Sequence, residues 1–391
     1  MNYSSVTGRL ATLGSAKWEV HFTARAMAAA GESILEMTIG EPDIPPDPRL
    51  LEQVTRSLNS GRISYASGRC EPVLARALTE KYRKYRPTVT ERNFLALPGA
   101  QTCLYTVIMA IAEAGDAILV GDPYYATYEG IIRASGAEPI FVPLRPENGF
   151  HMKAADLEAV ITPKCRAVLI NTPHNPTGAV LSAAEIAAIG QVCLRHNLWL
   201  ISDEVYADMV YEGQFVTPFA NPDLAEIVLS IGSVSKSFAA PGLRSGWVAA
   251  PEEFVDRCQP LAEAMLFGNQ PFIADATAWG IANQLTTGRE FGSHCLRRAR
   301  LVEEALEGCN LLRLHRPEAG MFVLVDIGQT GMTSHNFAMA LLQQERVAVM
   351  PGSSFGANLE GYLRLSLTTP DEVILEACQR LRNFAGRIRG R

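Results

Sequence analysis

Between residues 94 and 231, short apolar segments alternate with helical ones, and this alternation limits the possible folds more than any other feature of the chain. The apolar segments that we expect to form strands are 94–97, 117–120, 139–142, 167–171, 199–201 and 227–231. Strands that alternate with helices build βαβ units, whose strands are parallel and whose crossovers are right-handed. We therefore expect an α/β fold with a mainly parallel sheet.

The pattern changes after Pro251, where long helical segments and shorter strands replace the regular alternation. A chain of 391 residues, 48% of them hydrophobic, is long enough for one large domain and a smaller one. We expect the large domain to span residues 33–285. Residues 1–32 and 286–391 are expected to form a smaller α+β domain together.

Polar residues follow several of the expected strands, close to the point where each strand ends. Asn175 follows the strand at 167–171, Asp203 follows the strand at 199–201, and Lys236 follows the strand at 227–231. In an open α/β sheet, ligands bind at the carboxyl ends of the strands. The sequence therefore predicts a binding site at this edge of the sheet.

Lys236 is the residue whose position most needs an explanation. It lies among small hydroxyl residues soon after an apolar strand, where a charged ammonium group is costly to bury. A desolvated lysine loses its proton and can form a Schiff base with a carbonyl compound. Ser233 and Ser235 offer hydroxyl groups, and the guanidinium of Arg244 suits a phosphate. This combination indicates pyridoxal phosphate; a surface lysine and an ordinary salt bridge are the alternative.

A second feature suited to an anion lies at Gly99, Ala100 and Gln101, between the strand at 94–97 and an apolar helical segment. The free N–H groups and the dipole of a helix N-terminus attract negative charge. Many α/β turns share this pattern, so it supports a phosphate site only in combination with Lys236.

Composition argues against several classes of function. The formal net charge is -6 and no long Lys/Arg tract is present, so we expect no nucleic-acid partner. No apolar run reaches the length of a membrane span, and residues 1–10 lack the apolar core of a signal peptide. The 8 cysteines are scattered without a Cys-x-x-Cys pair, which favours reduced thiols in a cytoplasmic protein and no metal site.

Five segments of the chain, taken in order, resemble those of a known family. They are Ile39-Gly40-Glu41-Pro42-Asp43, Asn175-Pro176-Thr177-Gly178, Ser202-Asp203-Glu204-Val205-Tyr206, Ser233-Val234-Ser235-Lys236 and Tyr362-Leu363-Arg364-Leu365-Ser366. Their ordered combination spans almost the whole chain and resembles the class I/II aminotransferases. The resemblance implies pyridoxal phosphate as cofactor, an amino acid and a 2-oxo acid as substrates, and a homodimer with shared active sites. It also implies fold type I, in which the large domain holds a mainly parallel seven-stranded sheet.

The resemblance assigns catalytic roles to Lys236, Asp203 and Tyr206. Lys236 resembles the lysine that carries the cofactor as a Schiff base and moves the proton of the substrate Cα. Asp203 resembles the carboxylate that keeps the pyridine nitrogen of the cofactor protonated. Tyr206 and Asn175 resemble the two groups that hydrogen-bond the phenolic oxygen of the cofactor.

The other expected contacts surround the ring and the phosphate of the cofactor. Tyr125 resembles the aromatic residue that stacks on the ring, and Tyr124 is the other candidate. The expected phosphate contacts are Ser233, Ser235, Arg244 and, at the helix N-terminus, Gly99, Ala100 and Gln101, with Tyr65 reaching in from the neighbouring subunit.

The expected substrate contacts are Arg364, Gly40 and Asn175. Arg364 resembles the arginine that binds the α-carboxylate of the substrate through two hydrogen bonds, and Gly40 would border the same carboxylate. Taken singly, an arginine in a strand more often pairs across the sheet, and an aspartate such as Asp203 more often caps a helix. The functional interpretation depends on the combination.

We expect the side chain of the preferred amino acid to be neutral or aromatic. Some bacterial aspartate aminotransferases that resemble this chain carry a lysine at the position of Ala100, and that cation is missing here. Trp18, Tyr65 and Phe267 are expected to border the side chain, and an unpaired distal carboxylate among them would be costly. The expected acceptor is 2-oxoglutarate or pyruvate.

Two other functions stay open at this point. A C–S β-lyase shares nearly all of these residues, because the fold does not fix the reaction; it would release pyruvate and ammonia in place of a new amino acid. A pyridoxal-phosphate-sensing domain of a transcription regulator would need a DNA-binding segment upstream, and only one short helix is expected before the first strand.

Overall fold

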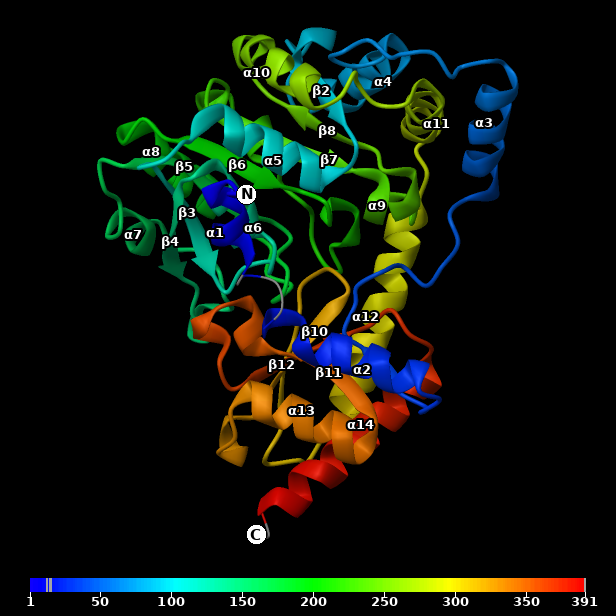
Figure 1. Cartoon of the computed structure of the whole chain (residues 1–391), viewed down its shortest axis with the longest axis vertical. Coiled ribbons are helices and arrows are strands. Elements are labelled where there is room, and N and C mark those ends of the chain that lie inside the picture. Colours follow the sequence, from blue (N-terminus) through cyan, green and yellow to red (C-terminus); the bar gives the residue numbers. More distant parts are fainter. Residues whose placement is uncertain (12, 14–15, 390–391) are drawn as a thin grey trace.

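The computed structural model describes residues 1–11, 13 and 16–389, and within them it contains two sheets, one above the other in Figure 1. The larger sheet has seven strands in the order β2-β8-β7-β6-β5-β3-β4. They are β2 (Phe94–Leu97), β3 (Ala117–Asp122), β4 (Glu138–Pro143), β5 (Cys165–Asn171), β6 (Trp199–Asp203), β7 (Val228–Ser233) and β8 (Gly246–Ala249). β8 runs antiparallel to the other six strands, which are parallel to one another. The expected mainly parallel seven-stranded sheet is confirmed.

Helices cover both faces of this sheet, because successive side chains of a strand point to opposite sides. In β5, for example, Val168 belongs to the core on one face and Leu169 to the core on the other. The helices on the Leu169 face are α5 (Ala100–Ile111), α6 (Tyr128–Ser135) and α10 (Glu252–Met265). Those on the Val168 face are α4 (Pro72–Arg83), α7 (Ala154–Glu158), α8 (Ala183–Arg195) and α11 (Pro271–Ala282), with α3 (Pro48–Asn59) packed on α11.

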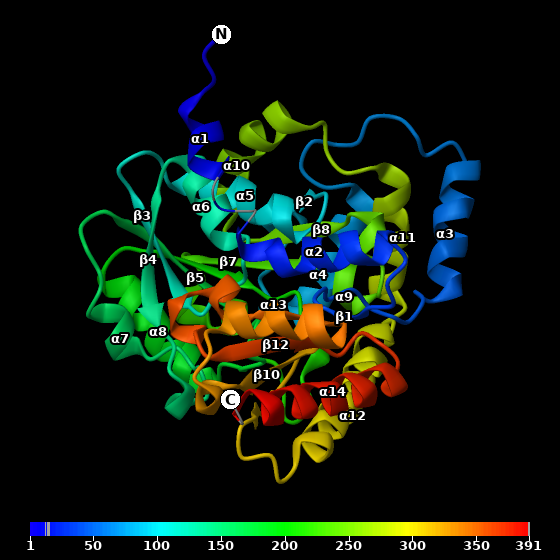
Figure 2. The same cartoon turned by 60° about the horizontal axis from the view of Figure 1, so that its bottom comes forward.

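The smaller sheet has its own hydrophobic core and lies in the lower half of Figure 1. Its strands, in the order β1-β11-β12-β10-β9, are β1 (Leu35–Met37), β11 (Val347–Pro351), β12 (Tyr362–Ser366), β10 (Phe322–Asp326) and β9 (Arg313–His315). The helices packed around it (Figure 2) are α2 (Glu19–Ala29), α12 (Thr287–Leu306), α13 (Ser334–Glu345) and α14 (Asp371–Arg389). β1 pairs with β11, although the expected boundary at residue 33 assigned it to the large domain.

The carboxyl ends of three parallel strands meet at the edge that faces the smaller sheet. Asn171, Asp203 and Ser233 end β5, β6 and β7, and Asn171 lies opposite Asp203 in the register. The single-turn helix α9 (Val234–Ser237) follows β7 directly and carries Lys236. This edge is the position at which the sequence predicts a binding site.

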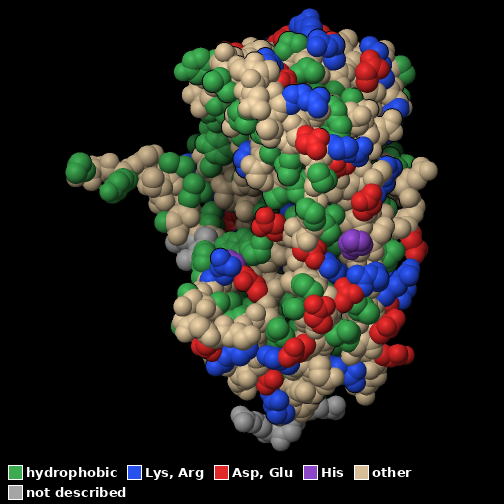
Figure 3. All heavy atoms as spheres, turned by 90° about the vertical axis from the view of Figure 1, so that its right-hand side faces the viewer, with side chains coloured by type: hydrophobic (Ala, Val, Ile, Leu, Met, Phe, Trp, Pro, Cys, Tyr) green, Lys and Arg blue, Asp and Glu red, His purple; other side chains and the backbone are tan. Residues whose placement is uncertain are grey.

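The residues before α1 (Ser5–Ala11) project from the body of the molecule, as Figures 2 and 3 show. The helix itself lies against α6, where Nε of Arg9 donates to the carbonyl of Arg133 at 3.1 Å, and none of its residues is buried. Met1 and Tyr3 at its start are exposed. Within the described ranges, no helix combines the length and the apolar character needed to cross a membrane. Residues 12, 14–15 and 390–391, which the expected smaller domain includes, lie outside the described residues.

Candidate active site

The side-chain amine of Lys236 contacts the backbone of the segment Ile39-Gly40-Glu41-Pro42-Asp43. Its Nζ donates a hydrogen bond of 2.6 Å to the carbonyl oxygen of Gly40. Burial lowers the pKa of Lys236 to about 8; Arg364 and Arg244 act in the same direction, and the carboxylate of Glu41 opposes them. A substantial share of this amine is therefore unprotonated at mildly alkaline pH, which is the form that attacks a carbonyl carbon.

Asp203, at the end of β6, is buried and held by two donors. Its Oδ2 accepts a hydrogen bond of 2.6 Å from the hydroxyl of Tyr128, and its Oδ1 accepts one of 3.3 Å from the backbone N–H of Val205. Burial raises the pKa of Asp203 to about 6, and both hydrogen bonds counteract that rise. Sequence reasoning missed Tyr128, because a tyrosine at the start of a helix has no local signal of such a role.

Asn175 joins Tyr206 to Arg364. Its Nδ2 donates to the hydroxyl of Tyr206 at 3.3 Å, and its Oδ1 accepts from Nη1 of Arg364 at 3.1 Å. Asn171, which the sequence analysis did not single out, fixes this arrangement: its Oδ1 accepts from the backbone N–H of Asn175 at 2.7 Å, and its Nδ2 donates to the carbonyl of Asp203 at 3.0 Å. One asparagine thus ties two candidate residues together.

Arg364, on β12, is buried with its guanidinium carbon 3.8 Å from the ring centroid of Phe322 and 4.3 Å from that of Phe355. Its Nη2 donates a hydrogen bond of 2.6 Å to the carbonyl of Thr38, and burial lowers its pKa to about 10. Its Nε is buried without a hydrogen-bond partner among the described residues. A planar guanidinium held in this way suits a carboxylate ligand.

The expected phosphate contacts meet where β7 ends and α5 begins. The hydroxyl of Ser233 donates to the carbonyl of Ser245 at 3.0 Å and lies 2.9 Å from the hydroxyl of Ser235. Nη2 of Arg244 lies 3.3 Å from the carbonyl oxygen of Pro98, directly before α5.

Two glycines permit this close approach. A Cβ on Gly99, whose φ is +86°, would lie 2.3 Å from a guanidinium nitrogen of Arg244. A Cβ on Gly246 would lie 2.9 Å from the backbone nitrogen of Ala100. Larger side chains would therefore fill the space between Arg244 and the N-terminus of α5, where the phosphate is expected.

Tyr125 and Tyr124 take different directions. The ring of Tyr124 stacks on Phe141 with centroids 5.0 Å apart and an interplanar angle of 17°, and its hydroxyl lies 3.2 Å from Nζ of Lys17. Tyr125 lies edge-on to Tyr128 at 5.5 Å, and the charges of Asp203 and Arg364 act on its hydroxyl. Tyr125 is therefore the one that lies on the side of the candidate site.

Two expected contacts lie away from this group in a single chain. The Oε1 of Gln101 accepts from the hydroxyl of Thr127 at 3.1 Å, and Gln101 is exposed. Tyr65 is 88% exposed and packs edge-on against Phe267, with centroids 5.5 Å apart. Tyr65 thus does not meet Lys236 in its own chain, as expected of a residue that would serve a neighbouring subunit.

The assembled groups fit pyridoxal phosphate chemically. They supply a partly neutral amine (Lys236), a buried carboxylate (Asp203), a hydroxyl with an amide (Tyr206 and Asn175), and a glycine-lined space beside Arg244. These are the donor and acceptor types that an aldehyde, a pyridine nitrogen, a phenolic oxygen and a phosphate require.

Comparisons with known proteins identify the family. The family model for aminotransferase class I and II matches residues 32–381. The chain is 37% identical over 391 residues to an arginine–pyruvate transaminase of Pseudomonas aeruginosa, covering 100% of both chains. It is 33% identical over 379 residues to an aspartate/prephenate aminotransferase of Cereibacter sphaeroides, covering 92% of this chain and 93% of the relative.

The fold agrees with these matches. The structure of an aspartate aminotransferase of Thermus thermophilus with maleate superposes with a TM-score of 0.91 at 28% identity, covering 98% of this chain and 100% of the other. The chain belongs to the class I and II aminotransferases, and it is a pyridoxal-phosphate-dependent aminotransferase of fold type I that acts on amino acids and 2-oxo acids.

Proposed function

We propose that the chain transfers an amino group between a neutral or aromatic L-amino acid and a 2-oxo acid, and that Lys236 binds the cofactor covalently as a Schiff base. The observation that carries this proposal is the amine of Lys236, whose lowered pKa and contact with Gly40 place an available nucleophile in the site that holds Asp203 and Arg364. The cofactor, when bound, supplies an electron sink for the substrate Cα.

The residues of the site have different proposed roles in the reaction. Lys236 takes the proton from the substrate Cα and returns it during transfer. Asp203, whose ionised form the hydrogen bond from Tyr128 favours, would hold a proton on the pyridine nitrogen of the cofactor. Tyr206 and Asn175 would hydrogen-bond its phenolic oxygen and so tune the acidity of the neighbouring nitrogen. The hydrogen bonds from Tyr128 to Asp203 and from Asn175 to Tyr206 support these roles.

Other residues are proposed to bind the cofactor and the substrate. We propose that Tyr125 stacks on the ring of the cofactor, and that Arg364 grips the substrate α-carboxylate, with Gly40 and Asn175 beside it. The proposed phosphate contacts are Ser233, Ser235, Arg244 and the amides of Gly99, Ala100 and Gln101, with Tyr65 of the neighbouring subunit.

The position of Ala100 supports a substrate without a distal carboxylate. Its methyl group stands at the N-terminus of α5, where a lysine would supply a second cation. A substrate with a distal carboxylate would need a second cation from elsewhere in the chain. Two arginines considered for this role are paired with other residues: Arg25 lies 3.7 Å from Glu36, and Arg69 pairs with Asp256. The test is the ratio of kcat/KM for phenylalanine, methionine or alanine to that for aspartate. A ratio well below one would contradict the proposed preference for a neutral or aromatic side chain.

Arginine is a second candidate donor. The relative that covers all of the chain at 37% identity is named an arginine–pyruvate transaminase. The carboxylate of Glu41 is close enough to Lys236 to raise its pKa, and it has no hydrogen-bond or ion-pair partner among the described residues. An anion at the mouth of the site would favour a cationic side chain. Glu41→Gln distinguishes the two candidates, because loss of the anion would lower kcat/KM for arginine more than kcat/KM for phenylalanine.

Product analysis separates transamination from the β-lyase reaction. Incubation of the enzyme with an amino acid and pyruvate should give one new amino acid for each 2-oxo acid formed. Release of ammonia together with pyruvate from a cysteine conjugate, without a new amino acid, would indicate the lyase.

A homodimer is proposed from the exposed apolar side chains around Tyr65. Ile63, Tyr65 and Phe267 are 72%, 88% and 68% exposed. Exposed aromatic and aliphatic groups of this size mark interaction surfaces. Size-exclusion chromatography with light scattering tests the dimer.

We further propose two properties of the whole chain. A cytoplasmic location fits the 8 cysteines, none of which forms a disulfide in the described part of the chain. The division into a large domain (33–285) and a smaller one (1–32 and 286–391) is proposed with one change: β1 is assigned to the smaller domain because it pairs with β11.

A further inference from the structure

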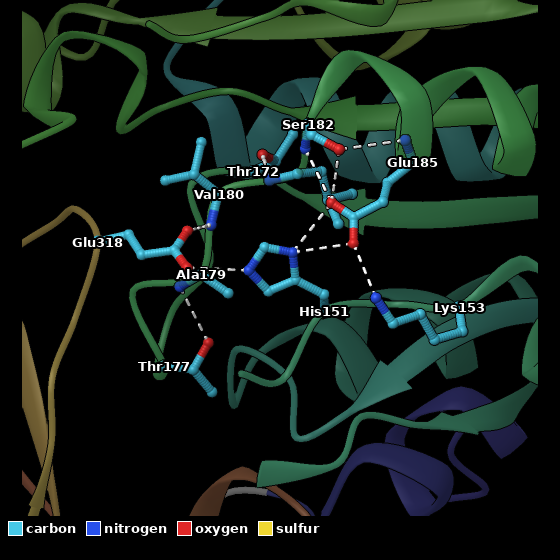
Figure 4. Close-up of polar contacts among 10 residues, drawn as sticks. His151, Lys153, Thr172, Thr177, Ala179, Val180, Ser182, Glu185 and Glu318 are labelled. Atoms are coloured by element: carbon cyan, nitrogen blue, oxygen red, sulfur yellow. Dashed lines mark hydrogen bonds and ion pairs between the residues drawn. The ribbon is translucent and has the colours of Figure 1, made fainter. Parts of the chain in front are cut away.

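His151 lies between two carboxylates that come from different parts of the fold (Figure 4). Its Nδ1 is 3.0 and 3.1 Å from the two carboxylate oxygens of Glu185, in the first turn of α8. Its Nε2 is 3.1 Å from Oε1 of Glu318, which lies in the connection between β9 and β10 of the smaller sheet. The ring therefore joins α8, which packs on the larger sheet, to a connection between two strands of the smaller sheet.

This geometry requires a protonated ring. A carboxylate oxygen only accepts hydrogen bonds, and a neutral imidazole has a single N–H to donate. Because both nitrogens of His151 face carboxylates at hydrogen-bond distance, only the imidazolium satisfies Glu185 and Glu318 together. The hydrogen bonds to Glu318 and Glu185 accordingly raise the pKa of His151, against the opposing effect of burial.

The other titratable groups around His151 are consistent with this charge state. Nζ of Lys153 lies 3.0 Å from Oε1 of Glu185, so that two cations face two carboxylates. His174 and His315 lie near this group: burial lowers the pKa of both, that of His174 to about 3, and the charge of His151 lowers both further. The proton that balances Glu318 is therefore assigned to His151, whose two nitrogens both face carboxylates.

Glu318 holds the loop that presents Asn175. Its Oε2 accepts from the backbone N–H of Val180 at 2.8 Å, and its own N–H donates to the carbonyl of Gly178 at 3.2 Å. A Cβ on Gly178 would lie 2.5 Å from Cβ of Pro317, so the two segments are in direct contact.

The loop with Asn175 and the segment that follows Glu318 both contact Arg364. Asn175 begins the loop that ends at Val180 and accepts from Nη1 of Arg364. Phe322 follows Glu318 by four residues along the chain, and its ring lies against the guanidinium of Arg364. A change in the contacts between Glu318 and this loop would therefore affect both Asn175 and Phe322, the two side chains that hold Arg364.

We propose that His151 is a positioning residue: its protonated ring ties the Glu318 segment to the Asn175 loop and makes the affinity of the Arg364 site for a carboxylate depend on pH. The tie is fully present below the ordinary pKa of histidine, about 6.5, and is lost as pH rises through the raised pKa of the folded state. The affinity part rests on the proposed role of Arg364, whereas the tie itself rests on the geometry around His151.

The first test measures the tie directly. The histidine ring signals of the labelled holoenzyme are titrated by NMR, and that of His151 is assigned by its loss in His151→Gln. We expect its pKa to lie above 6.5, to fall in Glu318→Gln, and to stay unchanged in Glu303→Gln. Glu303 is a matched control because it pairs with Arg316, close to Glu318 in sequence. A pKa at or below 6.5, or one that Glu318→Gln leaves in place, would overturn the proposal.

The second test measures the consequence for the site. Dissociation constants of 3-phenylpropionate, a carboxylate that cannot transaminate, are measured for the holoenzyme between pH 5.5 and 9.5. We expect His151→Gln to weaken binding about two- to fivefold at the acidic end, with the curves converging at the alkaline end. Glu318→Gln should weaken binding as well, although removal of a negative charge alone would strengthen binding of an anion.

The outcomes separate the two claims. Curves that coincide for wild type and His151→Gln, or tighter binding in Glu318→Gln, would contradict a positioning role for His151. Failure of the wild type to bind the carboxylate at any pH would instead contradict the role of Arg364, and the NMR titration would still decide whether the tie exists. If His151→Gln does not fold, His151→Asn takes its place in the assignment and in both measurements.

Discussion

The hydroxyl of Tyr128 donates to Oδ2 of Asp203 at 2.6 Å, and both side chains are buried. The bond joins the first residue of α6 to the last residue of β6. Burial alone would favour the neutral form of Asp203, and this hydrogen bond favours the ionised form. Tyr128 therefore helps to keep the carboxylate charged at the point where the pyridine nitrogen of the cofactor is expected.

Tyr128→Phe should lower kcat about tenfold to a hundredfold, because a hydrogen bond to a charged group contributes about 1.5–3 kcal/mol. It should also raise the pKa of Asp203, which is visible as a shift in the acidic limb of the pH profile of kcat. Tyr124→Phe is the matched control, since that hydroxyl contacts Lys17 and Glu129 instead. Equal kinetics for the two variants would contradict the role of Tyr128.

Lys236 should react with its cofactor as an amine of lowered pKa. Burial lowers its folded pKa to about 8 from 10.5, so the neutral fraction reaches one half at a pH of about 8 and levels off only well above that pH. The rate of covalent capture of pyridoxal phosphate by the apoenzyme should follow this curve in stopped-flow absorbance measurements. A midpoint near 10.5 would mean that the amine is solvated.

Much of the fold was predictable from local pattern. The strand at 94–97 was expected with the bounds that it has, and the strands expected at 117–120 and 199–201 begin at the residues where β3 and β6 begin. The helix α3 and the strand β8 were missed. β8 has only four residues with a glycine at one end, and its antiparallel place between β2 and β7 depends on contacts far along the chain.

In the candidate site, too, some residues were predictable from the local sequence and others were not. Lys236, Asp203 and Asn175 were recognisable because each follows a strand end, and these ends meet at one edge of the sheet. Tyr128 and Phe355 were not, because a tyrosine at a helix start or a phenylalanine in a short turn has no local signal. Their roles arise only from the residues that the fold brings to them.

Arg364→Lys should raise KM for the amino acid about tenfold to a hundredfold, because lysine loses the second hydrogen bond to the carboxylate. It also loses the planar group that fits between Phe322 and Phe355. Arg313→Lys, at an exposed position of the same sheet, is the control and should leave KM unchanged. A KM in Arg364→Lys equal to that of the wild type would show that the carboxylate binds elsewhere.

Subunit mixing tests whether Tyr65 serves the neighbouring chain. Tyr65→Phe and Lys236→Ala subunits, each poorly active alone, should form heterodimers in which one site is unimpaired. Activity should therefore rise above the sum of the two after mixing and reassembly. Activity that equals this sum at every ratio, in mixtures that demonstrably contain heterodimers, would contradict a shared site.

The most direct measurement of the central claim is the location of the reducible cofactor bond. The holoenzyme is treated with borohydride, digested, and its peptides are analysed by mass spectrometry. The pyridoxyl group should be found on Lys236 in the wild type and on no peptide of Lys236→Ala. A pyridoxyl group on another lysine of the wild type, or one that persists in Lys236→Ala, would contradict the assignment of Lys236.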